Sequence, residues 1–331
     1  MREQDNAGTM RRVAPGAVDH SVHTAYSNPA RFADLIADVP PEPAALSEVA
    51  RNVIVHYRAS GHQLPEHSKA DVNARWLDSI LDLDQSRHPT PLAEPREVTE
   101  RVQGCCRDHT LFSVGVLRAH GVAARSRVGF AGYFIDGWHH DHVIVEAWID
   151  GRWQRFDSEV AEPRTSLPTP LDIGQCPLES QGFVTAAQVW DGYRRGAIEP
   201  STYGVGPEVP GLRGERFIFD EVIYEVAHRF GDELLLWDSW GRIGAPDEPV
   251  TETDAAWLDG VAVLLLAADS GDGHAEQALL DRYGIDKGLH PATTIVQASP
   301  YGNPPVSVDL VTRRVTPHPS DAVGKLGPDG D

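Results

Sequence analysis

The spacing of apolar side chains divides the chain into a helical first part, a short strand-rich middle and a helical last part. In the first part, apolar residues recur at the spacing of one helix face. This pattern begins near Asn28, with Pro29 at the first helical position, and it recurs over residues 46–57 and 71–83. We therefore expect a series of helices before the proline-rich loop at residues 89–95.

The spacing changes in the middle of the chain. A helical pattern over residues 106–117 ends before Gly121, and strand-like runs follow at residues 124–130, 141–148 and 153–157. The dipeptide Asp150-Gly151 stands between the last two runs, and such a pair favours the two-residue turn of a β-hairpin. The pattern predicts a helix followed by a small antiparallel sheet.

Helical spacing returns at residues 184–193, 217–230, 255–268 and 275–283. Because helices flank a small β region instead of alternating with strands, the pattern predicts an α+β fold. We divide the chain into a disordered tail at residues 1–24, a core with N-terminal helices at 25–200, a helical extension packed on that core at 201–315, and a disordered tail at 316–331.

Composition narrows the function classes. The chain has 331 residues, 41% of them hydrophobic, which is enough for a substantial core. Its net charge of −20 repels phosphate backbones and anionic lipids, so we expect neither nucleic acid nor a membrane as a partner. Three cysteines are too few for a disulfide framework, and no apolar segment resembles a signal peptide, so we expect a cytoplasmic protein.

Candidate chemistry begins at Cys106, where the helical pattern starts two positions after Gly104. The positive end of a helix dipole and the free N–H groups there favour a thiolate and an oxyanion. Cys105 points about 100° away on a helix, so only one of the two cysteines can face a given histidine. The alternative is a pair of inert core cysteines, since free cysteine is usually buried.

His142 and Asp157 complete a nucleophile, a base and an orienting carboxylate. His142 begins a strand-like run, and Asp157 ends the next one. The hairpin predicted at Asp150-Gly151 places these two runs side by side, so each weak signal strengthens the others. A cysteine paired with a histidine that a carboxylate orients is the arrangement of covalent acyl chemistry.

A second interpretation of the same region is a metal site. His139, His140, Asp141 and His142 form a run of potential ligands. Successive residues of an extended chain point to opposite faces, so this run does not easily direct three ligands to one ion. We therefore expect no metal or other cofactor, with His139 and His140 at the rim of the cleft.

The region also resembles the transglutaminase-like core. That family shows Gly-x-Cys-Arg-Asp, then Leu-Arg-x-x-Gly-Ile-Pro-Ala-Arg, a His-Ala-Trp-Val-Glu strand and a Gly-x-Trp-x-x-Phe-Asp strand. The corresponding residues here are Gly104 to Asp108, Leu117 to Arg125, His142 with Glu146, and Gly151 to Asp157. The resemblance implies a papain-like fold with Cys106 as the nucleophile, His142 as the base and Asp157 as the orienting group. Val143-Ile144 and Ser158-Glu159 depart from the family pattern, which has Ala-Trp and Pro-Thr there.

From these residues we expect an enzyme that forms a thioester acyl-enzyme from an amide or thioester and passes the acyl group to an amine or to water. Its substrate would be a peptide, a carrier-bound group or a small molecule. Gln103, Asp108 and Glu146 are candidates for oxyanion binding or for support of the site. The alternatives are a catalytically silent member that binds peptides or proteins, and a metal-dependent hydrolase that uses the histidine run. The sequence does not specify an oligomeric state.

Overall fold

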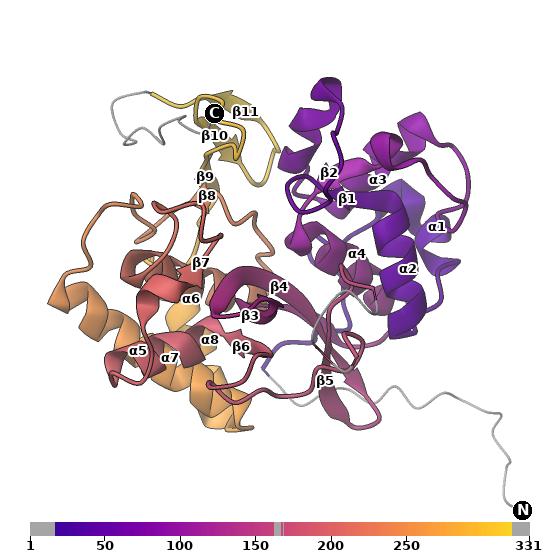
Figure 1. Ribbon diagram of the computed structural model, residues 1–331. Coiled ribbons are helices and arrows are strands. Elements are labelled where there is room, and N and C mark those ends of the chain that lie inside the picture. Colours follow the sequence, from indigo (N-terminus) through magenta and orange to yellow (C-terminus); the bar gives the residue numbers. More distant parts are fainter. Residues whose placement is uncertain (1–16, 162–166, 168, 320–331) are drawn as a thin grey trace, which may run out of the picture.

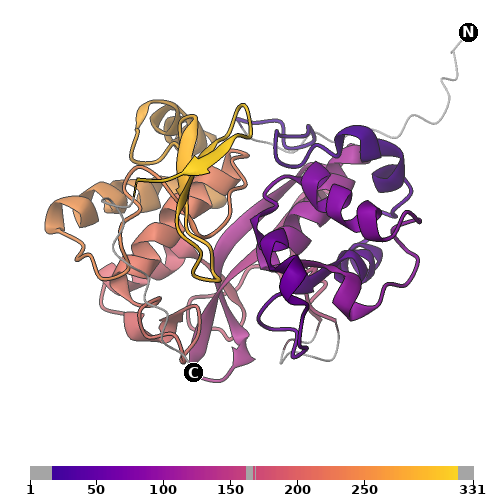
Figure 2. The same ribbon diagram turned by 90° about the horizontal axis from the view of Figure 1, so that it is seen from above.

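The centre of the molecule is a mixed β-sheet with helices on both sides. The computed structural model describes residues 17–161, 167 and 169–319 (Figure 1). The N-terminal helices lie on one side of the sheet and the C-terminal helices lie on the other (Figure 2). The predicted α+β class is therefore confirmed. Among the residues that the structure describes, no helix has the length and apolar character needed to cross a membrane.

The central sheet has the strand order β5-β4-β3-β6, and β7 pairs with β4. Its strands are β3 (Ala124–Ile135), β4 (Trp138–Ile149), β5 (Arg152–Phe156), β6 (Phe183–Thr185) and β7 (Tyr203–Gly204). Only β7 runs parallel to its neighbour. Asp150 and Gly151 connect β4 to β5 with φ angles of 52° and 79°, as a type I′ turn requires. The predicted hairpin is confirmed.

Helix α4 (Cys106–Ala119) packs against β3 and β4 with its apolar face buried, including Leu111 and Leu117. The Asp108 carboxylate accepts a hydrogen bond of 2.8 Å from the backbone N–H of Cys105, and the Cys105 sulfur faces the N–H of Asp108. This reciprocal capping satisfies donors at the helix start and fixes the residue at which α4 begins. The first turns of α4 are also tied to β4, because Thr110 donates a hydrogen bond of 2.8 Å to the Val143 carbonyl.

The N-terminal elements cover the outer side of α4 (Figure 1). In chain order they are η1 (Ala30–Phe32), α1 (Ala33–Ala37), α2 (Pro43–Val53), β1 (Ile54–His56), η2 (Glu66–Asn73), α3 (Leu77–Arg87), η3 (Val98–Glu100) and β2 (Val102–Gly104). Strands β1 and β2 pair in parallel, and β2 leads into α4.

The predicted bounds of two N-terminal helices were wrong. The helix expected over residues 46–57 ends at Val53, because the next three residues pair with β2 instead. The helix expected over residues 71–83 is divided between η2 and α3. Between them the buried Arg75 forms an ion pair of 2.5 Å with Asp238, and this distant contact overrides the helical spacing.

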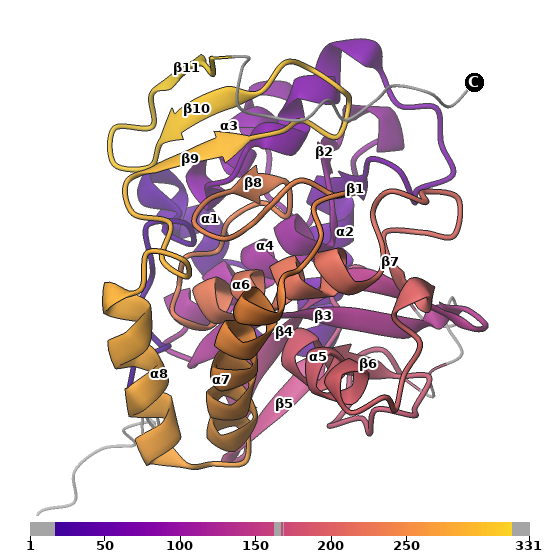
Figure 3. The same ribbon diagram turned by 90° about the vertical axis from the view of Figure 1, so that its left-hand side faces the viewer.

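The C-terminal helices pack against the other side of the sheet, where α6 and α5 contact β3. They are α5 (Ala186–Arg194), α6 (Glu215–Arg229), α7 (Glu252–Asp269) and α8 (Gly273–Ile285), with a 3-10 turn η4 (Pro200–Thr202) after α5. Helices α7 and α8 lie side by side at the edge of the molecule (Figure 3).

A second sheet, which the sequence did not predict, follows the C-terminal helices. Its strand order is β11-β10-β9-β8, with β8 (Asp238–Ser239), β9 (Thr294–Gln297), β10 (Val306–Asp309) and β11 (Val315–Pro317). The extension expected to be helical at 201–315 therefore contains strands in addition to its helices. The tail expected from residue 316 begins later, since Thr316 pairs with Ser307. Residues 320–331 lie outside the described part of the chain.

The first tail is also shorter than we expected. Residues 1–16 lie outside the described residues, but residues 17–24 pack on the fold. His20 is buried, and its carbonyl accepts a hydrogen bond of 3.0 Å from the N–H of Ala124 at the start of β3. Thr24 donates a hydrogen bond of 2.6 Å to Glu233. The polar composition of this segment suggested disorder. Its order comes from contacts with Ala124 and Glu233, which are distant in the sequence and leave no local signal.

Candidate active site

Cys106 is the first residue of α4, and its side chain is only 5% exposed. The hydrogen bond of the Cys106 thiol with Cys105, together with burial, raises the pKa of the Cys106 thiol well above its ordinary value of 9.0. We had expected the helix start to favour the thiolate, but here the neighbouring thiol and burial outweigh that effect. The resting group is therefore a thiol, and it needs a base close by to become a nucleophile.

His142 and Asp157 lie within hydrogen-bond distance of each other, as the sequence predicted. The Nε2 atom of His142 lies 2.7 Å from Oδ2 of Asp157, and both side chains are buried. Asp157 directly follows β5 and also accepts hydrogen bonds of 2.7 Å from the Tyr133 hydroxyl and 3.0 Å from the N–H of Glu159. These bonds fix both the carboxylate and the imidazole ring that it holds.

The two partners shift each other's pKa. Burial alone would lower the pKa of His142, but the Asp157 carboxylate raises it above the ordinary value of 6.5. Burial alone would raise the pKa of Asp157, but His142 and the hydrogen bond from Tyr133 hold it below 3.8. Asp157 is therefore ionised at neutral pH, and His142 is a stronger proton acceptor than a free imidazole.

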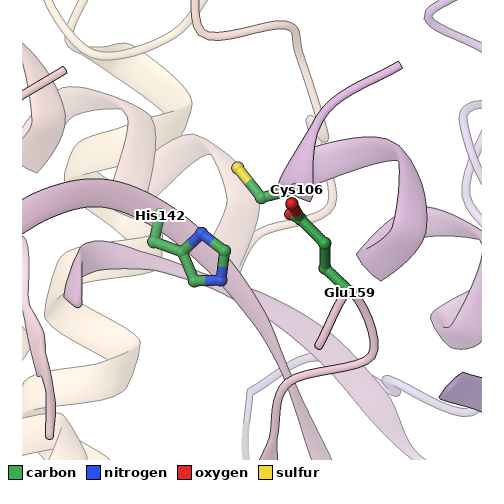
Figure 4. A group of neighbouring side chains, drawn as sticks. All are labelled: Cys106, His142 and Glu159. Atoms are coloured by element: carbon green, nitrogen blue, oxygen red, sulfur yellow. The ribbon is translucent and has the colours of Figure 1, made fainter. Parts of the chain in front are cut away.

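Cys106, His142 and Glu159 come together at the start of α4 (Figure 4). The Cys106 sulfur, a His142 ring nitrogen and a Glu159 carboxylate oxygen all lie within 4.8 Å of one another. Because Nε2 of His142 bonds Asp157, the ring nitrogen on the side of the thiol is Nδ1 (Figure 4). Cys105 is not part of this group, and its sulfur caps α4 instead.

The sequence did not identify Glu159 or Tyr133 as parts of this site. Glu159 was visible only as a departure from the family pattern after Asp157. The direction of its side chain depends on the loop that follows β5, which has no periodic pattern. Tyr133 lies near the end of β3, and its contact with Asp157 requires the register of the sheet.

The candidates for supporting roles have other partners in the structure. Gln103 donates hydrogen bonds of 2.9 Å to the Pro65 carbonyl and 2.8 Å to the Ser68 hydroxyl, so its amide is engaged and does not serve as a free oxyanion donor. Asp108 does support the site, since its carboxylate caps the helix that begins at Cys106.

Glu146 lies away from the thiol in a buried ionic cluster. Its carboxylate forms ion pairs of 2.7 Å with Arg125, 3.2 Å with Arg127 and 2.8 Å with Arg155. Arg127 also contacts Asp269 of α7 at 2.5 Å. Burial would raise the pKa of Glu146, but the three arginines hold it well below 4.5. We had grouped Glu146 with the residues that support the site, but these arginines engage its carboxylate four positions along β4 from His142.

His139 and His140 take no part in a cluster of metal-binding side chains in the part of the chain that the structure describes. The His139 ring stacks on Tyr203 with centroids 4.2 Å apart, and His140 contacts Phe134 edge to face. Burial lowers the pKa of His140 to about 4, so its ring is neutral at physiological pH. The histidine run therefore does not form the metal site that one alternative required.

The fold and this geometry define an α+β protein with a buried Cys–His–Asp arrangement at the junction of a helix and an antiparallel sheet. Residues 55–158 match the model of the transglutaminase-like superfamily. The family resemblance found in the sequence is therefore confirmed over this part of the chain, which is similar to a transglutaminase-like core. The match includes Cys106, His142 and Asp157, and it stops before Glu159.

Comparison with solved structures gives one further likeness, to a crystal structure from Cytophaga hutchinsonii whose protein is named as a candidate cysteine protease. The sequence identity is 17% and the TM-score is 0.28, over 42% of this chain and 40% of that one. The chain thus spans less than half of that protein, and we draw no inference from a likeness at this level. No curated protein matches the chain.

Proposed function

We propose that this protein is a cysteine enzyme that forms a thioester acyl-enzyme on Cys106. The observation that supports the proposal best is that the buried thiol of Cys106 lies beside His142, which in turn contacts Asp157. Covalent acyl chemistry uses these three groups in this order, and hydrogen bonds from Tyr133 and Glu159 hold the carboxylate that orients the base. The presence of all three groups in one place favours an enzyme over a silent binding protein.

In the first half-reaction, Nδ1 of His142 accepts the thiol proton while the sulfur attacks the carbonyl carbon of an amide or thioester. The tetrahedral oxyanion can be stabilised by the backbone N–H of Cys106, which has no carbonyl acceptor within the helix because it lies in the first turn. His142 then gives its proton to the leaving amine or thiol, and a thioester to Cys106 remains. Asp157 stays ionised and holds the imidazolium.

In the second half-reaction, water or an amine attacks the thioester. His142 removes a proton from the attacking group and returns it to the Cys106 sulfur as the thioester breaks. Hydrolysis and acyl transfer use the same protein groups, so the acceptor that reaches the thioester decides the product. The donor is an uncharged or cationic amide or thioester, because a chain of net charge −20 disfavours strongly anionic substrates.

Profiling with acyl donors tests this proposal. Purified protein would be treated with small peptide amides and thioesters, each with and without a primary amine, and followed by intact mass. We expect the chain to gain the mass of the acyl group, and we expect the adduct to disappear on addition of hydroxylamine. Cys106→Ser should abolish the adduct, whereas Cys105→Ser should retain it. An adduct that survives in Cys106→Ser would overturn the assignment.

A further inference from the structure

The group Cys106, His142 and Glu159 has the composition of a metal site. It offers one thiolate sulfur, one imidazole nitrogen and one carboxylate oxygen, which are the ligand types that zinc binds. It is also the only set of three such side chains that comes together within the residues that the structure describes. Neither the histidine run nor the superfamily match points to this combination.

The separations suit a tetrahedral ion after a small adjustment. Zinc bonds are about 2.3 Å to sulfur and about 2.0–2.2 Å to nitrogen or oxygen, which places tetrahedral ligand atoms about 3.3–3.6 Å apart. The corresponding atoms here lie within 4.8 Å of one another. Each pair must approach by roughly 1.5 Å at most. Rotation about the side-chain bonds of Glu159 and of Cys106 can supply that movement, because His142 is already fixed by Asp157.

Glu159 provides an independent indication that something is missing from this group. Its side chain is 14% exposed, and its Oε2 atom is buried without a hydrogen-bond partner. A buried carboxylate oxygen without a partner is costly. The other oxygen, Oε1, lies 4.0 Å from Nε2 of His56, which is too far for a hydrogen bond. A cation at the thiol would satisfy Glu159.

The surroundings of His142 are those of a metal ligand. Histidines that bind metals commonly donate their other ring N–H to a carboxylate, which orients the ring. Here the Asp157 carboxylate accepts a hydrogen bond of 2.7 Å from Nε2 of His142. The lone pair of Nδ1 then faces the thiol. The backbone N–H of Glu159 donates to the same Asp157 carboxylate, so one group holds both the ring of His142 and the backbone of Glu159.

We propose that Cys106, His142 and Glu159 bind one Zn²⁺ ion, with water as the fourth ligand, and that the bound ion reversibly blocks the thiol. Binding forms a sulfur–zinc bond and releases the thiol proton to solvent, with no oxidation or reduction. The ion occupies both the nucleophile and the base, so neither is available for acyl transfer. Metal binding follows from the geometry alone, and the inhibitory effect rests on the proposed function.

Metal binding is measured without reference to activity. The full-length reduced protein, freed of metal with a chelator, would be titrated with Zn²⁺ by calorimetry and with Co²⁺ by absorption. We expect one ion per chain and a sulfur-to-cobalt charge-transfer band. The band should vanish in Cys106→Ser and persist in Cys105→Ser. Glu159→Gln should weaken zinc binding by at least about tenfold. The matched controls, His140→Ala and the exposed Glu66→Gln, should bind zinc as the unchanged protein does.

A second arm follows alkylation of Cys106 by iodoacetamide. Zinc should protect the thiol in the unchanged protein, and Glu159→Gln should need at least about tenfold more zinc for the same protection. Without metal, Glu159→Gln should be alkylated at least as fast, because a negative charge near the sulfur is gone. Equal zinc affinity in Glu159→Gln, or absence of stoichiometric binding, would overturn the site.

The two proposals fail in different ways. If the metal-free protein forms the acyl-enzyme but zinc neither binds nor protects Cys106, the zinc site is wrong and the proposed function stands. If the metal-free protein forms no acyl-enzyme and zinc confers hydrolysis, the thiol mechanism is wrong, and so is the inhibitory role of the ion.

Discussion

The Nε2 atom of His142 and the Oδ2 atom of Asp157 lie 2.7 Å apart, although one residue is inside β4 and the other follows β5. The register of the hairpin pairs Val145 with Phe156, so the two residues reach each other diagonally beyond the last paired position. The Asp150-Gly151 turn sets this register. A local turn signal therefore positions two side chains that are fifteen residues apart in the sequence.

Replacement of Asp157 by Asn tests the orienting role. The amide keeps the shape but can present its N–H₂ to the ring, which favours the wrong tautomer of His142. We expect acylation of Cys106 to slow by roughly 10²–10⁴-fold, with an unchanged far-UV spectrum. The control is Tyr133→Phe, which removes one hydrogen bond to the same carboxylate and should cost about tenfold. A loss in Asp157→Asn no larger than in Tyr133→Phe would refute an orienting role for this carboxylate.

The pH dependence of acylation follows from the direction of the His142 shift. The base must be unprotonated, and its pKa lies above 6.5, so the rate should fall as the pH decreases through a value above 6.5. Removing the Asp157 charge leaves burial to dominate, which lowers the pKa of His142. In Asp157→Asn the acid limb should therefore move to lower pH. The Asp141 carboxylate also raises the pKa of His142, so Asp141→Asn should give a smaller shift in the same direction. A limb that moves to higher pH would contradict this assignment.

Glu146 should matter for stability and not for the reaction. Glu146→Gln leaves three buried arginines without this carboxylate, so the free energy of unfolding in urea should fall by about 3–5 kcal/mol. The control is Glu252→Gln, which breaks a surface pair with Arg194 and should cost less than about 1 kcal/mol. Below the unfolding transition, Cys106 in Glu146→Gln should be alkylated at the unchanged rate.

The loss of unfolding free energy in Glu146→Gln should also depend on pH in a definite direction. The folded pKa of Glu146 lies well below its ordinary value of 4.5, so its contribution to stability is complete above that value. The contribution is lost as the pH falls toward the depressed folded pKa. The difference in unfolding free energy between the unchanged protein and Glu146→Gln should therefore shrink below pH 4.5. A difference that grows on acidification would show that Glu146 is not the ionised partner of these arginines.

The elements that position Cys106, His142 and Asp157 were predictable because each has a local signal. A helix start, an alternating strand and a two-residue turn depend on neighbouring residues, and together they place the three side chains. The proposed zinc site also requires Glu159, and the direction of its side chain depends on a loop without a periodic pattern. The sequence therefore predicted the proton-transfer pair but not the carboxylate beside the thiol.

Other features depend on distant partners that a sequence pattern does not contain. Gln103 was a plausible oxyanion donor by its place before the cysteines, but its amide N–H groups donate to Pro65 and Ser68. Helical spacing near Arg75 is interrupted because its ion pair with Asp238 joins residues far apart in the chain. The strands β8 to β11 are two to four residues long, too short for a periodic signal.

The relative alkylation rates of the three cysteines test directly whether Cys106 is the reactive thiol. The metal-free protein would be exposed briefly to limiting iodoacetamide at neutral pH, digested and mapped by mass for Cys105, Cys106 and Cys176. We expect the label to appear first on Cys106, and we expect His142→Ala to slow this labelling while the slower labelling of Cys176 stays the same. Preferential labelling of Cys105 or Cys176, or a Cys106 rate that His142→Ala leaves unchanged, would contradict the assignment of Cys106 as the reactive thiol.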